Sequence, residues 1–162
     1  EITYGDWSSD VCSSDLQMSK SKTYVQNFLL CQKYPFLKVK NVWSGKSQGY
    51  EFTELDSLPT GWKERFGLAI CEELNKLFKT SKVKNFNKKY HIIQIKEKYG
   101  SLRWYDNGVP TDIQEKYDEI IGKYETLSAK TCVMCGKDCK IESFGGWFMP
   151  ICEECLETMQ EG

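Results

Sequence analysis

Four cysteines near the C-terminal end of the chain have the residue type and the spacing to bind a metal ion. Cys132 and Cys135 form one Cys-x-x-Cys pair, Cys152 and Cys155 form a second, and sixteen residues separate the two pairs. Two residues between cysteines allow a tight turn that aims both sulfurs at one point, so two such pairs can surround one tetrahedral Zn²⁺ ion. Four thiolates fill the coordination shell, whereas a catalytic zinc ion keeps one position open. The pattern therefore predicts a structural zinc site.

Three other uses of these cysteines fit the sequence less well. Disulfide bonds need an oxidising compartment, and we recognise no signal segment that would take the chain there. A thioredoxin-like redox site needs a single Cys-x-x-Cys motif, and here there are two matched pairs. Zinc deaminases have an upstream His-x-Glu motif, which is absent, and Pro150 lies one residue too early for their Pro-Cys motif. Cys139 is interpreted as a non-ligand, and an exchange between Cys139 and Cys135 is left open.

The residues around the cysteines predict a small zinc module over residues 129–162. Gly136 follows the second cysteine, where the turn around a metal needs a left-handed backbone. Residues 140–144 and 147–151 have the pattern of two short strands joined by a Gly145-Gly146 turn. Residues 152–160 then predict a short helix or turn. This order of elements is typical of a zinc ribbon or a treble clef.

The first sixteen residues do not have the character of a protein segment. Residues 6–16, DWSSDVCSSDL, are the translation of a widely used sequencing-adapter sequence. We interpret residues 1–16 as adapter read-through rather than native protein, with native translation starting at Met18; the alternative is a disordered tail rich in Ser and Asp. Without them the 23 acids fall to 19 against 22 bases, so the formal net charge changes from −1 to +3.

Residues 18–128 predict an α+β domain in which helices pack on a short antiparallel sheet. Apolar residues recur at helical spacing from Lys22 to the stop at Pro35. A second helix of roughly eighteen residues begins near Trp62, and a third follows Pro110, where Thr111 and Gln114 predict a capping box. The residues expected on the buried face of the second helix are Trp62, Phe66, Ala69, Ile70, Leu74, Leu77 and Phe78.

Residues 91–106 predict a β-hairpin that turns at Tyr99-Gly100. Alternation along its strands predicts a buried side made of Ile93, Ile95, Leu102 and Trp104. The opposite side carries the five candidate ligand-binding residues, which are Gln94, Lys96, Lys98, Arg103 and Tyr105.

The hairpin lies in a basic stretch of the sequence. Between Lys76 and Arg103 there are nine Lys or Arg and one acid, Glu97, and aromatic residues are interleaved among them. Lysines neutralise phosphates and exposed aromatic rings stack on bases, so this mixture suits nucleic acid or nucleotides. The alternative is a solvated strand face next to a flexible basic loop.

No group of residues in the sequence indicates catalysis. His91 is the sole histidine, so a Ser-His-Asp arrangement could form only around it, and a strand histidine without a catalytic role is the simpler interpretation. Adjacent acids such as Glu72 and Glu73 point in different directions on a helix. We therefore expect function by binding, and an enzyme built around His91 is the third-ranked hypothesis.

Several motifs in order give the chain a family resemblance. They are Gly61-Trp62, QIKEKYGSLRWY at residues 94–105, KYETLS at residues 123–128, TCVMCGK, and GGWFMPICEEC. Together they resemble an uncharacterised family of small proteins from bacteriophage, prophage and related bacterial genomes, with the pattern GW, QxKEKYGxLRxY, CxxCG, GW and CxxC. The resemblance implies a cytosolic, zinc-holding accessory protein and supplies no activity.

The expected function is that of a small phage-type zinc-binding accessory protein that binds nucleic acid or a host protein. The alternative is a counter-defence protein that sequesters an anionic nucleotide signalling ligand in a basic-aromatic pocket. No apolar run approaches the length of a membrane span, so we expect a protein of the cytoplasm, or of the host cytoplasm if a phage encodes it. The sequence leaves the oligomeric state open.

Overall fold

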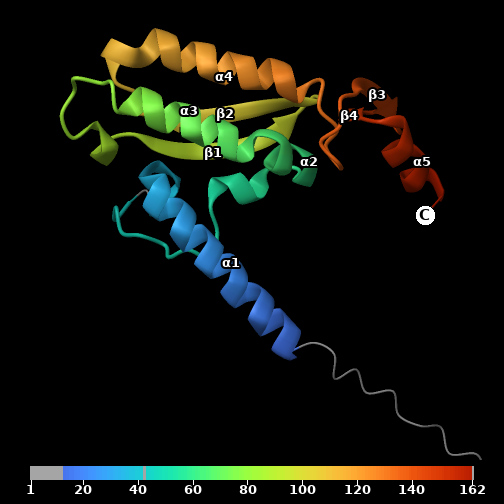
Figure 1. Cartoon of the computed structure of the whole chain (residues 1–162), viewed down its shortest axis with the longest axis horizontal. Helices are drawn as coiled ribbons and strands as arrows, with labels where there is room; N and C mark the ends of the chain where they lie inside the picture. The colour runs from blue at the N-terminus through green and yellow to red at the C-terminus, as the bar shows by residue number, and fades with distance from the viewer. Residues whose placement is uncertain (1–12, 42, 162) are drawn as a thin grey trace, which may run out of the picture.

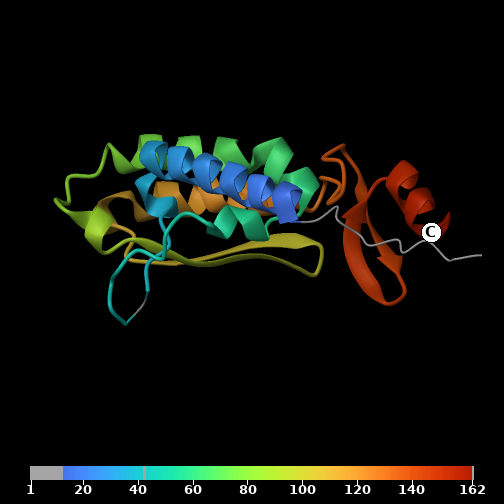
Figure 2. The same cartoon turned by 90° about the horizontal axis from the view of Figure 1, so that it is seen from below.

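A two-stranded antiparallel sheet, β1 (His91–Lys98) and β2 (Ser101–Asn107), lies against a layer of helices in the computed structural model, which describes residues 13–41 and 43–161. The helices α3 (Leu68–Phe78) and α4 (Gln114–Ser128) lie on one side of this sheet, and among the described residues no helix covers its other face (Figure 1; Figure 2). A second antiparallel pair, β3 (Lys140–Phe144) and β4 (Trp147–Ile151), comes later in the chain. The fold is α+β, as predicted.

The main helical run is continuous from Thr60 to Phe78 but contains a wider turn. It consists of α2 (Thr60–Trp62), a π-helical segment (Lys63–Gly67) and α3. The predicted apolar face is buried at Trp62, Phe66 and Ile70, but Ala69, which was expected on that face, is exposed. The expectation for Ala69 was wrong because the π turn adds residues to the helix and rotates the face that follows it. Trp62, Phe66 and Ile70, which are four positions apart, therefore all lie on the core side of the helical run.

The β1–β2 hairpin turns at Tyr99-Gly100, as predicted. Both residues have positive φ, 53° and 78°, which suits a two-residue turn that follows the twist of the strands. Ile95, Leu102 and Trp104 are buried as predicted, but Ile93 is 57% exposed. The prediction for Ile93 was wrong because the strand register shifts between Ile92 and Gln94. A bulge of this kind adds a residue to one strand, so simple alternation fails there.

Both edges of this sheet are tied to neighbouring elements. The Ile95 N–H donates to the Glu54 carboxylate at 3.3 Å, and Glu54 begins a 3₁₀ turn, Glu54–Ser57. On the other edge the Leu102 N–H donates to the Ser128 hydroxyl at 2.7 Å. Ser128 is the last residue of α4 and is itself buried. These two bonds fix the sheet under the helices and leave its uncovered face pointing outward.

The helix α4 buries the predicted apolar face and lacks the predicted cap. Ile113, Tyr117, Ile121 and Tyr124 are buried against the core. The capping box was wrong: Thr111–Ile113 forms a 3₁₀ turn, and α4 starts at Gln114 without a side-chain cap. The Gln114 amide instead donates to the Asp118 carboxylate one turn later at 2.9 Å.

The helix α1 (Ser13–Lys33) ends just before Pro35, as predicted, and a 3₁₀ turn (Pro35–Leu37) follows. Cys31, Tyr34 and Leu37 enter the core at this end. Residues 1–12 lie outside the described residues, and residues 13–16 form the start of α1. The interpretation of residues 1–16 as adapter read-through therefore stays a prediction.

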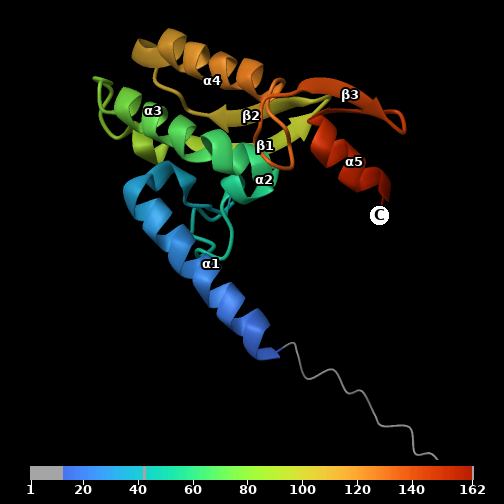
Figure 3. The ribbon, with the colours of Figure 1, turned by 45° about the vertical axis from the view of Figure 1, so that its right-hand side comes forward.

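The C-terminal elements match the predicted order. The strands β3 and β4 join through Gly145 and Gly146, whose φ values are 55° and 85°, and α5 (Glu153–Glu161) follows. Figure 3 shows β3 beyond the turn of the β1–β2 hairpin, with α5 beside it. The core of the chain, by contrast, is formed by the helical run, α4 and the buried side of the first hairpin.

Candidate functional site

Four cysteines come together at the start of the C-terminal module. The sulfurs of Cys132, Cys135, Cys152 and Cys155 all lie within 4.8 Å of one another. The Cys135 and Cys152 sulfurs are 3.6 Å apart. A tetrahedral zinc ion with Zn–S bonds of about 2.3 Å places its sulfurs about 3.8 Å apart, so the separations fit a single ion. The predicted cluster is confirmed as a group that could hold a metal.

The first pair lies on a tight turn. The Gly136 N–H donates to the Cys132 carbonyl at 3.0 Å, and the Cys132 N–H donates to the Lys137 carbonyl at 2.8 Å. Gly136 has a φ of 74°, which glycine adopts without the strain that a side chain would add. The predicted need for glycine at this position is confirmed.

The Cys132 sulfur is prepared for ionisation by backbone donors. Burial of this thiol opposes its ionisation, but the N–H groups of Cys135, Cys152 and Met134 lower its pKa to about 6. Metals bind the thiolate and not the thiol. The turn thus supplies a ligand in the form that a metal ion requires.

The second pair lies at the start of α5. Cys152 immediately precedes the helix, and Cys155 is in its first turn, where the Leu156 N–H donates to the Cys152 carbonyl at 2.9 Å. The positive end of a helix dipole favours negative charge, which suits thiolates. The Val133 N–H donates to the Pro150 carbonyl of β4 at 2.9 Å and so joins the first turn to the strand before the second pair.

Cys139 does not belong to this group. Its N–H donates to the Lys130 carbonyl at 2.9 Å, and burial raises the pKa of its thiol to about 12. This placement agrees with its interpretation as a non-ligand.

The first cysteine turn packs directly on Gly61. A Cβ atom at Gly61 would lie 2.2 Å from the Cys132 carbonyl oxygen and 2.4 Å from the Gly136 nitrogen. The Gly61 N–H donates to the Val133 carbonyl at 2.8 Å. Sequence reasoning recognised Gly61-Trp62 as a motif but missed this role, because the contact joins residues more than seventy positions apart. Only glycine allows the two backbones to approach so closely.

A second contact holds the module at the turn of the first hairpin. A Cβ atom at Gly100 would lie 3.1 Å from the Ile141 side chain, so β3 rests on this turn. The metal module is thus fixed to the helical run at one point and to the β1–β2 turn at another.

The five candidate ligand-binding residues lie on the uncovered face of the β1–β2 sheet. Lys96 is paired with Arg103, and Gln94 with Tyr105. The Lys96 ammonium lies 5.2 Å from the centre of the Tyr105 ring, a cation–π contact that holds both side chains over the sheet. Together with Lys98, these residues form what we call the open face.

Arg103 is a half-buried cation of the open face. Its Nη1 donates to the Leu102 carbonyl at 3.1 Å and lies 4.0 Å from the Glu125 carboxylate of α4. About a third of its side chain is accessible. The long Arg103–Glu125 separation makes a weak ion pair that an incoming anion could replace.

The basic connection between α3 and β1 is tied to the fold. The Ser81 hydroxyl and the Lys82 N–H both donate to Asp112, and Phe86 is buried in the core. The lysines of this connection, Lys79, Lys82, Lys84, Lys88 and Lys89, are all exposed.

A second structured loop precedes the main helical run. Asn41 accepts bonds from the Trp43 and Ser44 N–H groups, and Lys40 pairs with Ser47 in an antiparallel bridge. Trp43 is 96% exposed in this loop. We refer to residues 38–41 and 43–48 as the Trp43 loop. The cluster of Ser, Gly and Lys in the sequence indicated a loop but not its place in the fold.

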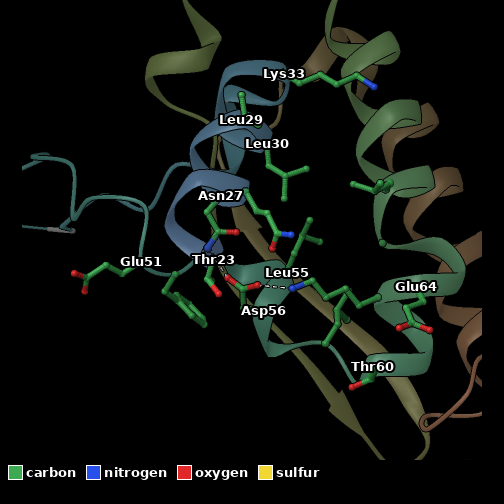
Figure 4. A pocket seen from close by; sticks show the side chains of 16 residues that line it. Thr23, Asn27, Leu29, Leu30, Lys33, Glu51, Leu55, Asp56, Thr60 and Glu64 are labelled. Atoms are coloured by element: carbon green, nitrogen blue, oxygen red, sulfur yellow. Dashed lines mark hydrogen bonds and ion pairs between the residues drawn. The ribbon is translucent and has the colours of Figure 1, made fainter. Parts of the chain in front are cut away.

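A groove of 910 Å³ lies elsewhere, between α1 and residues 51–68 (Figure 4). Leu30, Leu55 and Leu58 give it an apolar lining, and Asp56 is paired with Lys63 and accepts a bond from Asn27. Its charged lining residues are two lysines and three acids, namely Lys33, Lys63, Glu51, Asp56 and Glu64. This balance does not favour an anionic nucleotide, and the groove contains none of the predicted ligand-binding residues.

His91 is engaged by the backbone. Its Nδ1 donates to the Lys89 carbonyl at 2.9 Å, since a carbonyl can only accept. This contact holds the imidazole ring at the start of β1.

In the part of the chain that the structure describes, no helix combines the length and the apolar character needed to cross a membrane. Comparison with known proteins gives no match: no family model, no curated protein and no solved structure is similar to the chain. The residues themselves must therefore carry the functional argument.

Proposed function

We propose that the protein is a zinc-stabilised accessory protein that binds nucleic acid through the open face and catalyses no reaction. The observation that carries the proposal is the composition of that face. Its paired residues are Gln94, Lys96, Lys98, Ser101, Arg103 and Tyr105, which give three cations, one exposed aromatic ring and no acid. A positive surface with an aromatic ring suits a polyanion that carries bases.

We infer that the metal is Zn²⁺ and that its role is structural. Four cysteine sulfurs at these separations are the ligand set of structural zinc sites, and they leave no position open for a substrate. The order of cysteine turn, hairpin and helix, with the second cysteine pair at the helix start, supports a treble-clef-like module. Reduced cysteines and a bound metal suit the cytoplasm, and the ordered motifs support an accessory protein of phage type.

The metal module supports the open face through the first hairpin. Ile141 of β3 rests on Gly100, which lies in the turn that joins Lys98 to Ser101. Loss of the metal would therefore release one end of the sheet that presents the basic residues. In this way the structural role of the metal site is linked to the binding role of the open face.

The test measures binding of fluorescently labelled single-stranded DNA, single-stranded RNA and duplex DNA by anisotropy at several salt concentrations. We expect binding that weakens steeply with added salt, because cations that contact phosphates release counterions. Lys98→Glu should lower the affinity about tenfold at low salt. Lys116→Glu, the same change at an exposed position of α4, should leave the affinity nearly unchanged.

Two results would contradict the proposal. The first is no binding to any of the three nucleic acids at low salt, including the case in which the chain captures only a host protein in a salt-insensitive way. The second is an equal loss of nucleic-acid affinity for Lys98→Glu and Lys116→Glu, because the loss would then depend on the net charge of the protein alone.

A further inference from the structure

Elements at both ends of the open face extend beyond it. In Figure 2 the Trp43 loop projects past the β1–β2 sheet at one end, and the β3–β4 hairpin projects past it at the other. Both project on the side away from the helices. The backbone of the Trp43 loop and that of the β3–β4 hairpin therefore extend further from the helices than the strands of the open face do.

Both of these elements carry exposed aromatic rings. Trp43 is 96% exposed in the loop, and Trp147 and Phe148 are 74% and 58% exposed in the β3–β4 hairpin. Between them Tyr105 of the open face is 41% exposed. Single exposed aromatic residues are ordinary on protein surfaces, but here they border one basic sheet from both ends. The rings can provide stacking platforms for bases.

The charge of these two elements extends that of the open face. The Trp43 loop carries Lys38, Lys40 and Lys46 and no acid among its described residues. The strand β3 carries Lys140 and one acid, Glu142. The Trp43 loop and the open face together thus bear six cations, and Glu125 of α4 is an acid next to Arg103 at the edge of the sheet.

The exposed rings and the neighbouring elements favour single-stranded over duplex nucleic acid. A two-stranded ribbon reads duplex DNA by entering the major groove, which is about 12 Å wide, so it must project from the protein. Here the backbone of the ribbon extends less far from the helices than that of the Trp43 loop and of the β3–β4 hairpin (Figure 2). In addition, the bases of a duplex are stacked on one another, and exposed aromatic rings can stack only on unpaired bases.

We propose that an unpaired nucleic-acid strand lies along the open face from the Trp43 loop to the β3–β4 hairpin. Its phosphates contact Lys96, Lys98 and Arg103, and its bases stack on Trp43, Tyr105 and Trp147. This inference rests on the proposed function and names its substrate class. Because Gln94 is the one uncharged amide on the open face, recognition depends on shape and charge more than on base sequence.

The length of the surface sets the length of the probe. The strand β1 has eight residues, and at about 3.3 Å per residue it spans roughly 26 Å. Single-strand sites on one small domain cover about 4 to 16 nucleotides. An oligothymidylate of about twelve nucleotides is therefore a suitable probe.

The experiment compares this oligothymidylate with a duplex of the same length, using the whole chain with zinc bound. We expect the single strand to bind at least about tenfold more tightly than the duplex. Trp43→Ala and Trp147→Ala should each lower single-strand affinity about tenfold, because each removes one stacking platform. Phe52→Ala, which removes an exposed ring in the groove beside α1, should leave the affinity unchanged. Thermal unfolding confirms that each variant is folded.

The outcomes separate this inference from the proposed function. Equal affinity for duplex and single strand overturns the inference and leaves nucleic-acid binding in place. The inference also fails if both tryptophan variants bind like the wild type while Lys98→Glu binds weakly. If neither probe binds and Lys98→Glu changes nothing, the proposed function itself fails.

Discussion

The indole Nε1 of Trp62 donates a buried hydrogen bond of 2.7 Å to the carbonyl of Thr131. Trp62 is fully buried at the start of the helical run, and Thr131 immediately precedes the first cysteine of the candidate metal site. The bond therefore connects the hydrophobic core to the metal module. Folding of the core positions Cys132, and binding of a metal should in turn stabilise the core.

Trp62→Phe tests this connection. The change keeps an aromatic ring but leaves the buried Thr131 carbonyl without its donor and opens a cavity, so we expect a loss of about 2–4 kcal/mol in the free energy of unfolding. Metal affinity should fall as well. Urea unfolding and a competitive zinc titration measure the two effects. Trp43→Phe, at an exposed tryptophan, is the matched control and should change neither.

Gly61→Ala tests the close approach of the cysteine turn. The new methyl group would meet the Cys132 carbonyl and the Gly136 nitrogen, so the module must shift away from the helical run. We expect a loss of about 1–3 kcal/mol in stability, together with weaker metal binding. Gly122→Ala is the control, because nothing lies within 4 Å of its Cβ position in α4. It should be neutral or stabilise the chain by up to about 1 kcal/mol. Equal effects of the two variants would argue against tight packing at Gly61.

Removal of a cysteine tests the metal site. Cys135→Ser removes one of the four sulfurs and should weaken zinc binding more than about a hundredfold. Cys139→Ser should retain one zinc ion per chain, because its sulfur is outside the group. Elemental analysis gives the metal content, and the charge-transfer bands of the cobalt-substituted protein report thiolate ligands. Equal metal loss in both variants would show that Cys139 is a ligand.

Chelation of the metal should affect residues 129–161 more than the rest of the chain. We expect amide signals of residues 129–161 to lose dispersion on treatment with a chelator, because a four-cysteine site organises its own backbone. The residues around Gly61 and Gly100 should shift, and the signals of α4 should change least. NMR spectra before and after chelation give this map, and uniform unfolding of the chain would contradict a local role.

Asp56 gives the fold a pH dependence with a defined sign. Burial opposes ionisation of its carboxylate, but bonds from Lys63, Thr53 and Asn27 outweigh burial and hold its pKa below the usual value. A group whose pKa is lower in the folded state stabilises the fold above its unfolded pKa of about 3.9. That contribution is lost as the pH falls below this value toward the folded pKa.

Asp56→Asn should therefore lower the free energy of unfolding by about 1–3 kcal/mol at pH 7. The difference between variant and wild type should shrink as the pH falls below about 4. Unfolding curves of both proteins across this pH range give the difference in their free energy of unfolding. Both proteins release the metal in acid, so that effect cancels in the difference. A difference that stays constant down to about pH 2.5 would exclude this role for the Asp56 carboxylate.

The local features were predicted well because their physics is local. The spacing of Cys132 from Cys135 sets the turn that aims two sulfurs together, and Gly136 supplies its backbone conformation. The Tyr99-Gly100 and Gly145-Gly146 turns depend on residues that accept positive φ. The apolar faces of α3 and α4 follow from helical spacing. Each of these signals lies within a few residues.

The errors in prediction have their causes in irregular backbone segments. Ile93 was expected to be buried, but the register shift beside it turns its side chain outward. Ala69 was displaced from the core face by the π turn in the preceding residues. The cap at Thr111 failed because a 3₁₀ turn precedes α4. In each case an irregularity of the backbone interrupts the regular period on which the prediction depended.

By itself, the sequence determined the four-cysteine site, the two hairpins and the basic character of the face between Gln94 and Tyr105, because spacing and alternation act over short distances. Only the tertiary structure decided that Gly61 and Trp62 hold the cysteine turn, and that the Trp43 loop and the β3–β4 hairpin rise at the two ends of the open face. These relationships join residues far apart in the chain, and they arise only when burial of a common core fixes the positions of all the elements at once.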